Sequence, residues 1–237
     1  LGDVYKRQGI NMSGFLNKNI DLRDSIVEMI AVFGLVFFGL GAVALGSFYS
    51  KNEIDAGFNI LNTFIIAFSH GFYIFIAIAS FARISGAHIN PAVTISMWLH
   101  KKISSKKTLF YLVAQLIGGI LGGLVWSLIF DSSLGVHSLS TGLFETSIVA
   151  GLSLEIICTA FLAAVIFSTI DNESHFMTAL AIGVTVCICI IASLPFTGGS
   201  LNPARSLGPA VAFGEYKDIW IYLSLIHISE PTRLHVI

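Results

Sequence analysis

The chain has 237 residues, of which 55% are hydrophobic and 11% are charged, and its mean hydropathy is +0.84. About 25% of the residues of an ordinary soluble domain are charged, so this composition excludes that class and predicts a membrane protein. The net charge of −1 says nothing about nucleic acid, but no basic run is long enough to suggest it, so no nucleic acid is expected as a partner.

Apolar windows recur along the chain, and each is close to the ~20 residues that cross a hydrocarbon core. The windows are 26–49, 58–81, 109–130, 148–170 and 177–194. The polar region before the first window lacks the pattern of a signal peptide, so this window doubles as the insertion signal. The sequence therefore predicts a multi-pass protein, for which we expect the cell membrane.

The distribution of basic residues predicts the orientation. Four lysines precede the third window, Lys18 and Arg23 precede the first, and the connection 131–146 contains neither lysine nor arginine. Because cytoplasmic loops carry an excess of lysine and arginine, the N-terminus is expected on the cytoplasmic side. The lysines before the third window are Lys101, Lys102, Lys106 and Lys107.

The tripeptide Asn-Pro-Ala occurs twice, and each copy has the character of a helix start. The copies are Asn90, Pro91, Ala92 and Asn202, Pro203, Ala204. Asn is a favoured N-cap and Pro suits the first helical position. The segment 85–92 aligns without gaps on 197–204, which indicates the internal repeat of a membrane transport fold. We expect a single channel domain over 1–237, with repeats at about 24–130 and 146–228.

The apolar stretch after each Asn-Pro-Ala is too short to span a bilayer. One runs from Pro91 to near Lys101 and the other from Pro203 to Phe213. Ten residues rise about 15 Å, half of a hydrocarbon core, so each stretch is expected to enter as a re-entrant half-helix. Two half-helices entering from opposite sides would meet N-terminus to N-terminus at the midplane.

Such a meeting point would select against ions. Each helix N-terminus carries about half a positive charge, which repels cations and protons. The side-chain amides of Asn90 and Asn202, turned inward, are expected to donate to the oxygen of one water molecule and so to break a proton-conducting chain. Backbone carbonyls of 86–89 and 198–201 are expected to provide the remaining polar groups for the solute.

Several further residues stand out at membrane depth. Glu28 and Glu155 lie in the first and fourth windows, where each is expected to accept backbone N–H groups of the loop before its own Asn-Pro-Ala. Arg205 takes the place that Val93 has in the first repeat, and a buried guanidinium favours a functional role. The glycines of 118–123 predict a close helix approach. Three cysteines lack metal-ligand spacing, so no metal is expected.

Together these residues resemble the aquaporins, or major intrinsic proteins. The resemblance rests on Ser-Gly-Ala-His-Ile-Asn-Pro-Ala-Val and Thr-Gly-Gly-Ser-Leu-Asn-Pro-Ala-Arg-Ser, and covers about 24–222. Glu28, Glu155 and Gln115 occupy the family's usual places, and His88 lies in the first motif as structural support. The resemblance implies an all-α hourglass of six transmembrane helices and two half-helices, assembled as a homotetramer in the lipid bilayer.

The resemblance also implies the residues of a selectivity filter. Counted from the motifs, these are His70, Ile190, Gly199 and Arg205. This set is similar to that of tonoplast intrinsic proteins, which pass ammonia or hydrogen peroxide as well as water. Glycerol-conducting relatives carry Asp directly after the filter arginine and a basic residue four positions on, whereas this chain has Ser206 and Ala210.

The two ends of the chain depart from the family. The apolar run 219–228 would rise about 15 Å, against roughly 30 Å needed to span, so the sixth helix is expected to be truncated. Residues 1–8 and 224–237 resemble translated sequencing-adapter read-through and are expected to be non-native.

One alternative from another class stays open at this point. A small secondary transporter can also be built on an inverted repeat with broken helices. Transporters couple to ions through buried acids, however, and the positions of Glu28 and Glu155 favour scaffolding. An enzyme is not expected, because no nucleophile, base and orienting group can be assembled, and no cofactor is implied. The function predicted is passive permeation of water and small neutral solutes, with exclusion of protons and ions.

Overall fold

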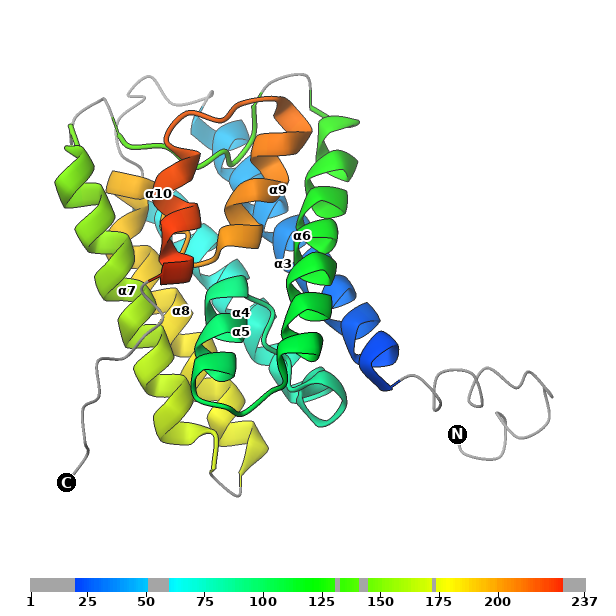
Figure 1. The fold of residues 1–237 in the computed structure, drawn as a ribbon. Coiled ribbons are helices and arrows are strands. Elements are labelled where there is room, and N and C mark those ends of the chain that lie inside the picture. Colours follow the sequence, from blue (N-terminus) through cyan, green and yellow to red (C-terminus); the bar gives the residue numbers. More distant parts are fainter. Residues whose placement is uncertain (1–19, 51–59, 131–132, 141–144, 172–173, 228–237) are drawn as a thin grey trace.

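A computed structural model describes residues 20–50, 60–130, 133–140, 145–171 and 174–227, and this part of the chain is helical with irregular connections. Five of its helices are long and apolar enough to cross a membrane, as the hydrophobic windows predicted. They are α3 (Ile20–Ser50), α4 (Ile60–Ser85), α6 (Ser105–Ser127), α7 (Ile148–Thr169) and α8 (His175–Thr197). These helices surround two short ones in the all-α arrangement that the sequence predicted (Figure 1).

The two short helices follow the Asn-Pro-Ala motifs. They are α5 (Pro91–Leu99) and α9 (Pro203–Phe213), which lie in opposite halves of the molecule with their first turns toward each other (Figure 1). The bounds of α9 are those predicted, whereas α5 ends at Leu99, two residues early, because Lys101 has a left-handed φ of 58°. The Asn side chains cap both helices, as expected for Asn followed by Pro.

The two faces of the bundle differ in charge. The starts of α3 and α6 and the end of α5 form one face, which we call the lysine-rich face. Two of its lysines form ion pairs: Lys107 Nζ lies 2.8 Å from the Asp24 carboxylate, and Lys106 Nζ lies 3.2 Å from the Asp21 carboxylate. The connection from α9 to α10 (Ile219–Leu223) lies at the opposite face, which we call the α10 face.

Glycines bring α6 close to two other helices. A Cβ on Gly118 would lie 2.2 Å from the Met29 carbonyl oxygen of α3, and one on Gly119 would lie 2.4 Å from the Ala204 carbonyl oxygen of α9. Atoms cannot approach so closely, so only glycine fits at these positions. The run at 118–123 therefore positions the half-helix within the chain.

The chain continues after α9 as α10, which has five residues, and as a 3₁₀ helix over Ser224–His227. Together they are much shorter than α6, which has 23 residues. Tyr222 and Leu225 in this segment are nevertheless fully buried. The expectations for 1–8 and for 228–237 lie outside the described residues.

Candidate functional site

The two loops that precede α5 and α9 have matching backbone conformations. Ile89 has a φ of 57° and Leu201 a φ of 55°, although a left-handed conformation is strained for such side chains. Gly86 and Gly198, 112 positions apart, both have positive φ as well. Because the two loops have the same backbone conformation, the carbonyls of Ile89 and Leu201 each point toward the other loop.

A buried glutamate holds each loop by the same set of bonds. Glu28 accepts from the backbone N–H of His88 at 2.9 Å and of Ile89 at 2.7 Å. Glu155 accepts from the backbone N–H of Ser200 at 2.9 Å and of Leu201 at 2.8 Å. Both carboxylates are fully buried, and the sequence had assigned them this role.

Side-chain hydroxyls and an amide complete these two networks. Ser85 donates to Glu28 and Thr197 donates to Glu155, each at 2.7 Å. Gln115 Nε2 donates to Glu28 at 2.8 Å, and His88 Nδ1 lies 3.1 Å from Thr94 Oγ1. Gln115 and His88 therefore support the first loop.

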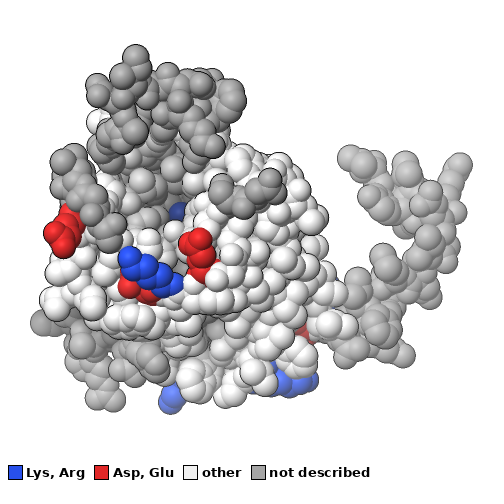
Figure 2. All heavy atoms as spheres, turned by 90° about the horizontal axis from the view of Figure 1, so that it is seen from above, with Lys and Arg blue, Asp and Glu red and all other residues white. Residues whose placement is uncertain are grey.

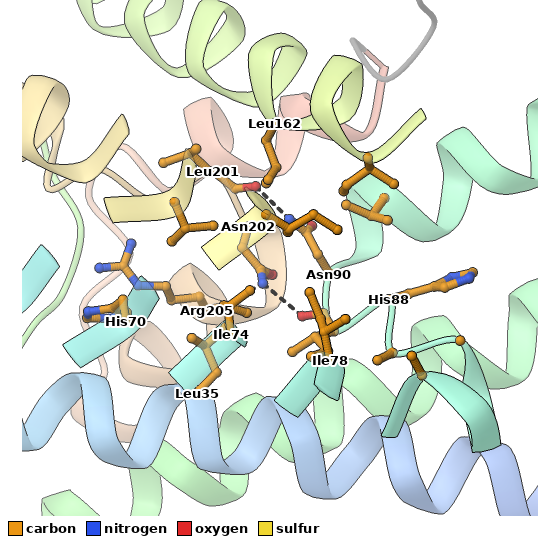
Figure 3. Close-up of a pocket in the computed structure, with 18 of the residues that line it drawn as sticks. Leu35, His70, Ile74, Ile78, His88, Asn90, Leu162, Leu201, Asn202 and Arg205 are labelled. Carbon is orange, nitrogen blue, oxygen red and sulfur yellow. Dashed lines mark hydrogen bonds between the residues drawn. The ribbon is translucent and has the colours of Figure 1, made fainter. Parts of the chain in front are cut away.

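The asparagines of the two motifs are joined by reciprocal hydrogen bonds. Asn90 Nδ2 donates to the Leu201 carbonyl at 2.8 Å, and Asn202 Nδ2 donates to the Ile89 carbonyl at 2.9 Å (Figure 3). Their Oδ1 atoms accept from the first turns of α5 and α9. One amide hydrogen of each Asn is thus engaged within the protein. The sequence had assigned the carbonyls of 89 and 201 to the solute alone, but the asparagines also use them.

A cavity of about 230 Å³ passes this junction. It extends from His175, at the start of α8 near the lysine-rich face, past Asn90 and Asn202 to Arg205. Figure 3 shows His88 toward one end of the cavity and His70 and Arg205 toward the other. Apolar side chains form most of the remaining wall, among them Leu35, Ile74, Ile78, Leu162, Ile182 and Val186. Polar residues line the cavity at the loops, the asparagines, the Arg205 end and, at the other end, at His175 and Thr178 of α8.

Three of the four filter residues predicted from the sequence line this cavity, namely His70, Ile190 and Arg205. The fourth, Gly199, contributes its carbonyl oxygen, which accepts from Arg205 Nη1 at 2.5 Å. The Ser200 carbonyl lies 3.3 Å from the same nitrogen. Arg205 is only 6% exposed. The α10 face is hollowed, and a basic side chain is visible deep inside (Figure 2).

His70 is oriented by two features of the helices around it. Its Nδ1 lies 2.7 Å from the Ile66 carbonyl, which can only accept, so Nδ1 carries the hydrogen. In the neutral ring, Nε2 is then an acceptor. A Cβ on Gly39 of α3 would lie 2.2 Å from Nε2, so the imidazole occupies space that glycine alone leaves open. Gly39 was not recognised from the sequence.

The structure adds His137 to this end of the site. It lies in the connection between α6 and α7, and it lines a second cavity of about 10 Å³ together with His70, Gly39 and Arg205. Its ring is 5% exposed, and Nδ1 has no hydrogen-bond partner among the described residues. Burial, followed by the charges of Arg205 and His70, holds the pKa of His137 well below its usual 6.5.

Sequence reasoning missed His137 because nothing local marks it. It occupies an irregular connection that has no hydrophobic period, where a side chain is expected to face water. The one available signal was a histidine two residues after Gly135, which takes the left-handed φ of 61° at the turn of the connection.

The arrangement suits a neutral solute. The N-termini of α5 and α9 contribute about half a positive charge each, and Arg205 adds a full charge 3 residues beyond Asn202. A cation would lose its hydration shell in this largely apolar cavity and would be repelled by the two helix N-termini and by Arg205. No cluster of three or more potential metal ligands occurs among the residues described.

Comparisons with known proteins agree with these features. The sequence profile of the family described as Major intrinsic protein matches residues 16–225. The chain is 37% identical over 206 residues to "Probable aquaporin TIP2-2" of Oryza sativa subsp. japonica, covering 85% of this chain and 80% of that one. It is 35% identical to "Aquaporin TIP2-1" of Arabidopsis thaliana, with the same coverage. The X-ray structure of the aquaglyceroporin from Plasmodium falciparum matches with a TM-score of 0.70 at 25% identity, covering 88% of this chain and 90% of that chain.

Proposed function

Because the chain belongs to the major intrinsic protein family and is a multi-pass membrane channel for water and small solutes, we propose that its filter also passes ammonia and hydrogen peroxide. Protons and other ions are excluded. The observation that carries this proposal is that the wall at the Arg205 end of the cavity is polar on some sides and apolar on another. His70 and Arg205 contribute polar groups there, whereas Ile190 contributes an apolar surface.

An apolar residue at 190 reduces the advantage of water over ammonia. Both molecules are small and neutral, but water has two lone pairs and ammonia has one, so a wall with several donors can form more hydrogen bonds to water. Ile190 cannot form hydrogen bonds, so it discriminates little. His70 adds an acceptor, because Nε2 is free of the bond that occupies Nδ1. This nitrogen can accept an N–H of ammonia.

Proton exclusion follows from the same elements. A proton moves along a chain of water molecules only if each can reorient. At the junction of α5 and α9, Asn90 and Asn202 both line the cavity, and the second hydrogen of each amide is left to donate to the solute. A water molecule that accepts from both asparagines is fixed in orientation, in a region that the two helix ends make positive.

Ammonia permeation is tested on residue 190. Protein is reconstituted into vesicles, an ammonia gradient is applied, and the internal pH is followed for wild type, Ile190→His and Ile190→Val. We expect Ile190→His to slow alkalinisation several-fold while water flux persists, and Ile190→Val to retain both. Equal ammonia rates in wild type and Ile190→His, with water flux intact, would contradict the role given to Ile190. Hydrogen peroxide is followed in the same vesicles with an enclosed peroxide-sensitive dye.

The secondary transporter has little support. Ion-coupled transport needs a carboxylate that can bind and release an ion in the cavity. Glu28 and Glu155 do not line the cavity, and their oxygens accept four and three hydrogen bonds respectively from groups of the protein. The carboxylates nearest the lysine-rich end, Asp21 and Asp24, are paired with lysines. Catalysis is not part of the proposal.

Four finer points are also proposals. Two inverted repeats, at about 24–130 and 146–228, are supported by the matching loops and glutamates. A cytoplasmic N-terminus is supported by the lysine-rich face. A homotetramer is carried over from the family resemblance, and native mass spectrometry in detergent tests it. The cell membrane has less support than an internal membrane, because the two plant relatives are of the tonoplast type.

A further inference from the structure

The connection between α6 and α7 turns inward from the α10 face and carries His137 to the filter. Leu134, His137 and Leu139 are all buried. The ring of His137 packs beside Gly198 and lies 5.3 Å from the ring of Tyr222, but its Nδ1 has no hydrogen-bond partner among the described residues. Because this nitrogen is not held, the position of the ring depends on the path of the backbone that carries it.

Two bonds hold that backbone just after His137. The Ser140 N–H donates to the Phe196 carbonyl of α8 at 2.9 Å. The Leu139 N–H donates to the carboxylate of Asp218 at 3.1 Å. Asp218 lies in the connection from α9 to α10, so its side chain links the two connections that border the hollow of the α10 face. It is the one side-chain tether that the structure shows on the described backbone at 134–140.

The conformation of Asp218 indicates that this tether is specific. Asp218 occupies the N-cap of α10, where a carboxylate ordinarily binds the N–H groups of the first turn, yet its side chain makes no capping bond. It also has a left-handed φ of 59°, which costs energy for a residue other than glycine. A good capping residue is thus held in a strained conformation while its carboxylate is directed to Leu139.

We propose that Asp218 is a positioning residue, which holds His137 at the filter and thereby sets the ratio of ammonia to water permeation. This inference rests on the proposed function, since it concerns the selectivity of the same filter. The competing explanation is that Asp218 acts only through the negative charge of the rim. Glu215 provides the control, because it lies three residues away in the same connection, is exposed, and its carboxylate accepts from the side chain of Ser133 rather than from the backbone at 134–140.

The transport test compares Asp218→Ala, Asp218→Asn and Glu215→Ala in vesicles, each with and without His137→Ala. Asp218→Ala should change the ammonia-to-water ratio in the same direction as His137→Ala and by at least half of its effect. Asp218→Asn should stay close to wild type, because the amide oxygen still accepts from Leu139. Glu215→Ala should leave the ratio unchanged. In the His137→Ala background, Asp218→Ala should add nothing, because the group that it positions is gone.

A second measurement reports the position of His137 without transport. Diethyl pyrocarbonate modifies accessible imidazoles, and peptide mass spectrometry gives the rate at each histidine. Asp218→Ala should raise the rate at His137 several-fold and leave the rate at His100, near the lysine-rich face, unchanged. An unchanged rate at His137 overturns the inference, as does an equal change of ratio in Glu215→Ala or an additive effect in the double variant. If the wild type passes no ammonia, the proposed function fails, and the modification rates still decide the role of Asp218.

Discussion

Replacement of Glu28 by glutamine should destabilise the protein far more than the loss of one surface charge. Glu28 accepts four hydrogen bonds. Two of them come from the backbone N–H groups of His88 and Ile89, which donate to different oxygens of the carboxylate. Glutamine has one oxygen and one NH₂ group. In either orientation of the amide, therefore, at least one buried N–H faces another donor.

The cost can be estimated from these bonds. An unsatisfied buried donor costs about 1–3 kcal/mol, and a hydrogen bond to a neutral acceptor is about 1 kcal/mol weaker than one to a charged group. With one bond lost and the other three weakened, Glu28→Gln should cost about 4–6 kcal/mol. This is a large share of the ~5–15 kcal/mol that stabilises a typical protein. At about 2–4 °C per kcal/mol, the midpoint of thermal unfolding should fall by about 10 °C or more.

The assay is thermal unfolding in detergent, followed by intrinsic fluorescence, with Glu145→Gln as the control. Glu145 is exposed, so the same chemical change there should move the midpoint very little. Water flux of Glu28→Gln should also fall, because the loop that carries Ile89 and Asn90 loses its anchor. A midpoint for Glu28→Gln within error of Glu145→Gln would refute the reasoning, since it would mean that the carboxylate does not hold the loop.

Four further predictions concern the pore. Asn202→Asp should weaken cation exclusion, because a carboxylate partly neutralises the helix ends; vesicle cation flux measures this, and unchanged exclusion in a folded variant counts against it. Arg205→Val, which copies the first repeat, should admit urea and protons, and unchanged fluxes of both would sink the filter assignment. Gly39→Ala should displace His70 and alter the ammonia-to-water ratio, measured as above; an unaltered ratio argues against that contact. His137 is held neutral in the fold, so below pH 6.5 the unfolded chain binds more protons than the folded one. The free energy of unfolding should therefore fall as the pH drops below 6.5, by up to about 1.4 kcal/mol per pH unit. Thermal scans at several pH values should show that the unfolding midpoint of His137→Asn depends less on pH than that of the wild type.

The parts of the fold that could be predicted from the sequence are those with a local cause. Hydrophobic windows of membrane length predicted the five long helices, because the bilayer sets their length. Asn followed by Pro predicted the starts of α5 and α9, because capping and a fixed φ act within a few residues. Even the end of α9 at Phe213 was predicted, where Gly214 supplies a left-handed C-cap.

The parts that could not be predicted depend on contacts between distant residues. The bonds of Asn90 to Leu201 and of Asn202 to Ile89 join residues 111 and 113 positions apart, so no local pattern reveals them. The same holds for Gly39, whose importance comes from the imidazole packed against it. His137 lies in a connection whose inward path is fixed by Phe196 and Asp218. The family resemblance therefore predicted three residues that line the Arg205 end of the cavity, namely His70, Ile190 and Arg205, and it missed His137, which the connection brings to that end.

The central claim, that this chain forms a selective water pore between the two Asn-Pro-Ala helices, is tested most directly by stopped-flow light scattering on proteoliposomes under an osmotic gradient. The account predicts shrinkage much faster than in protein-free liposomes, with a shallow temperature dependence, no saturation and no accompanying proton flux. Shrinkage at the rate of protein-free liposomes, or water flux that carries protons with it, would contradict the account.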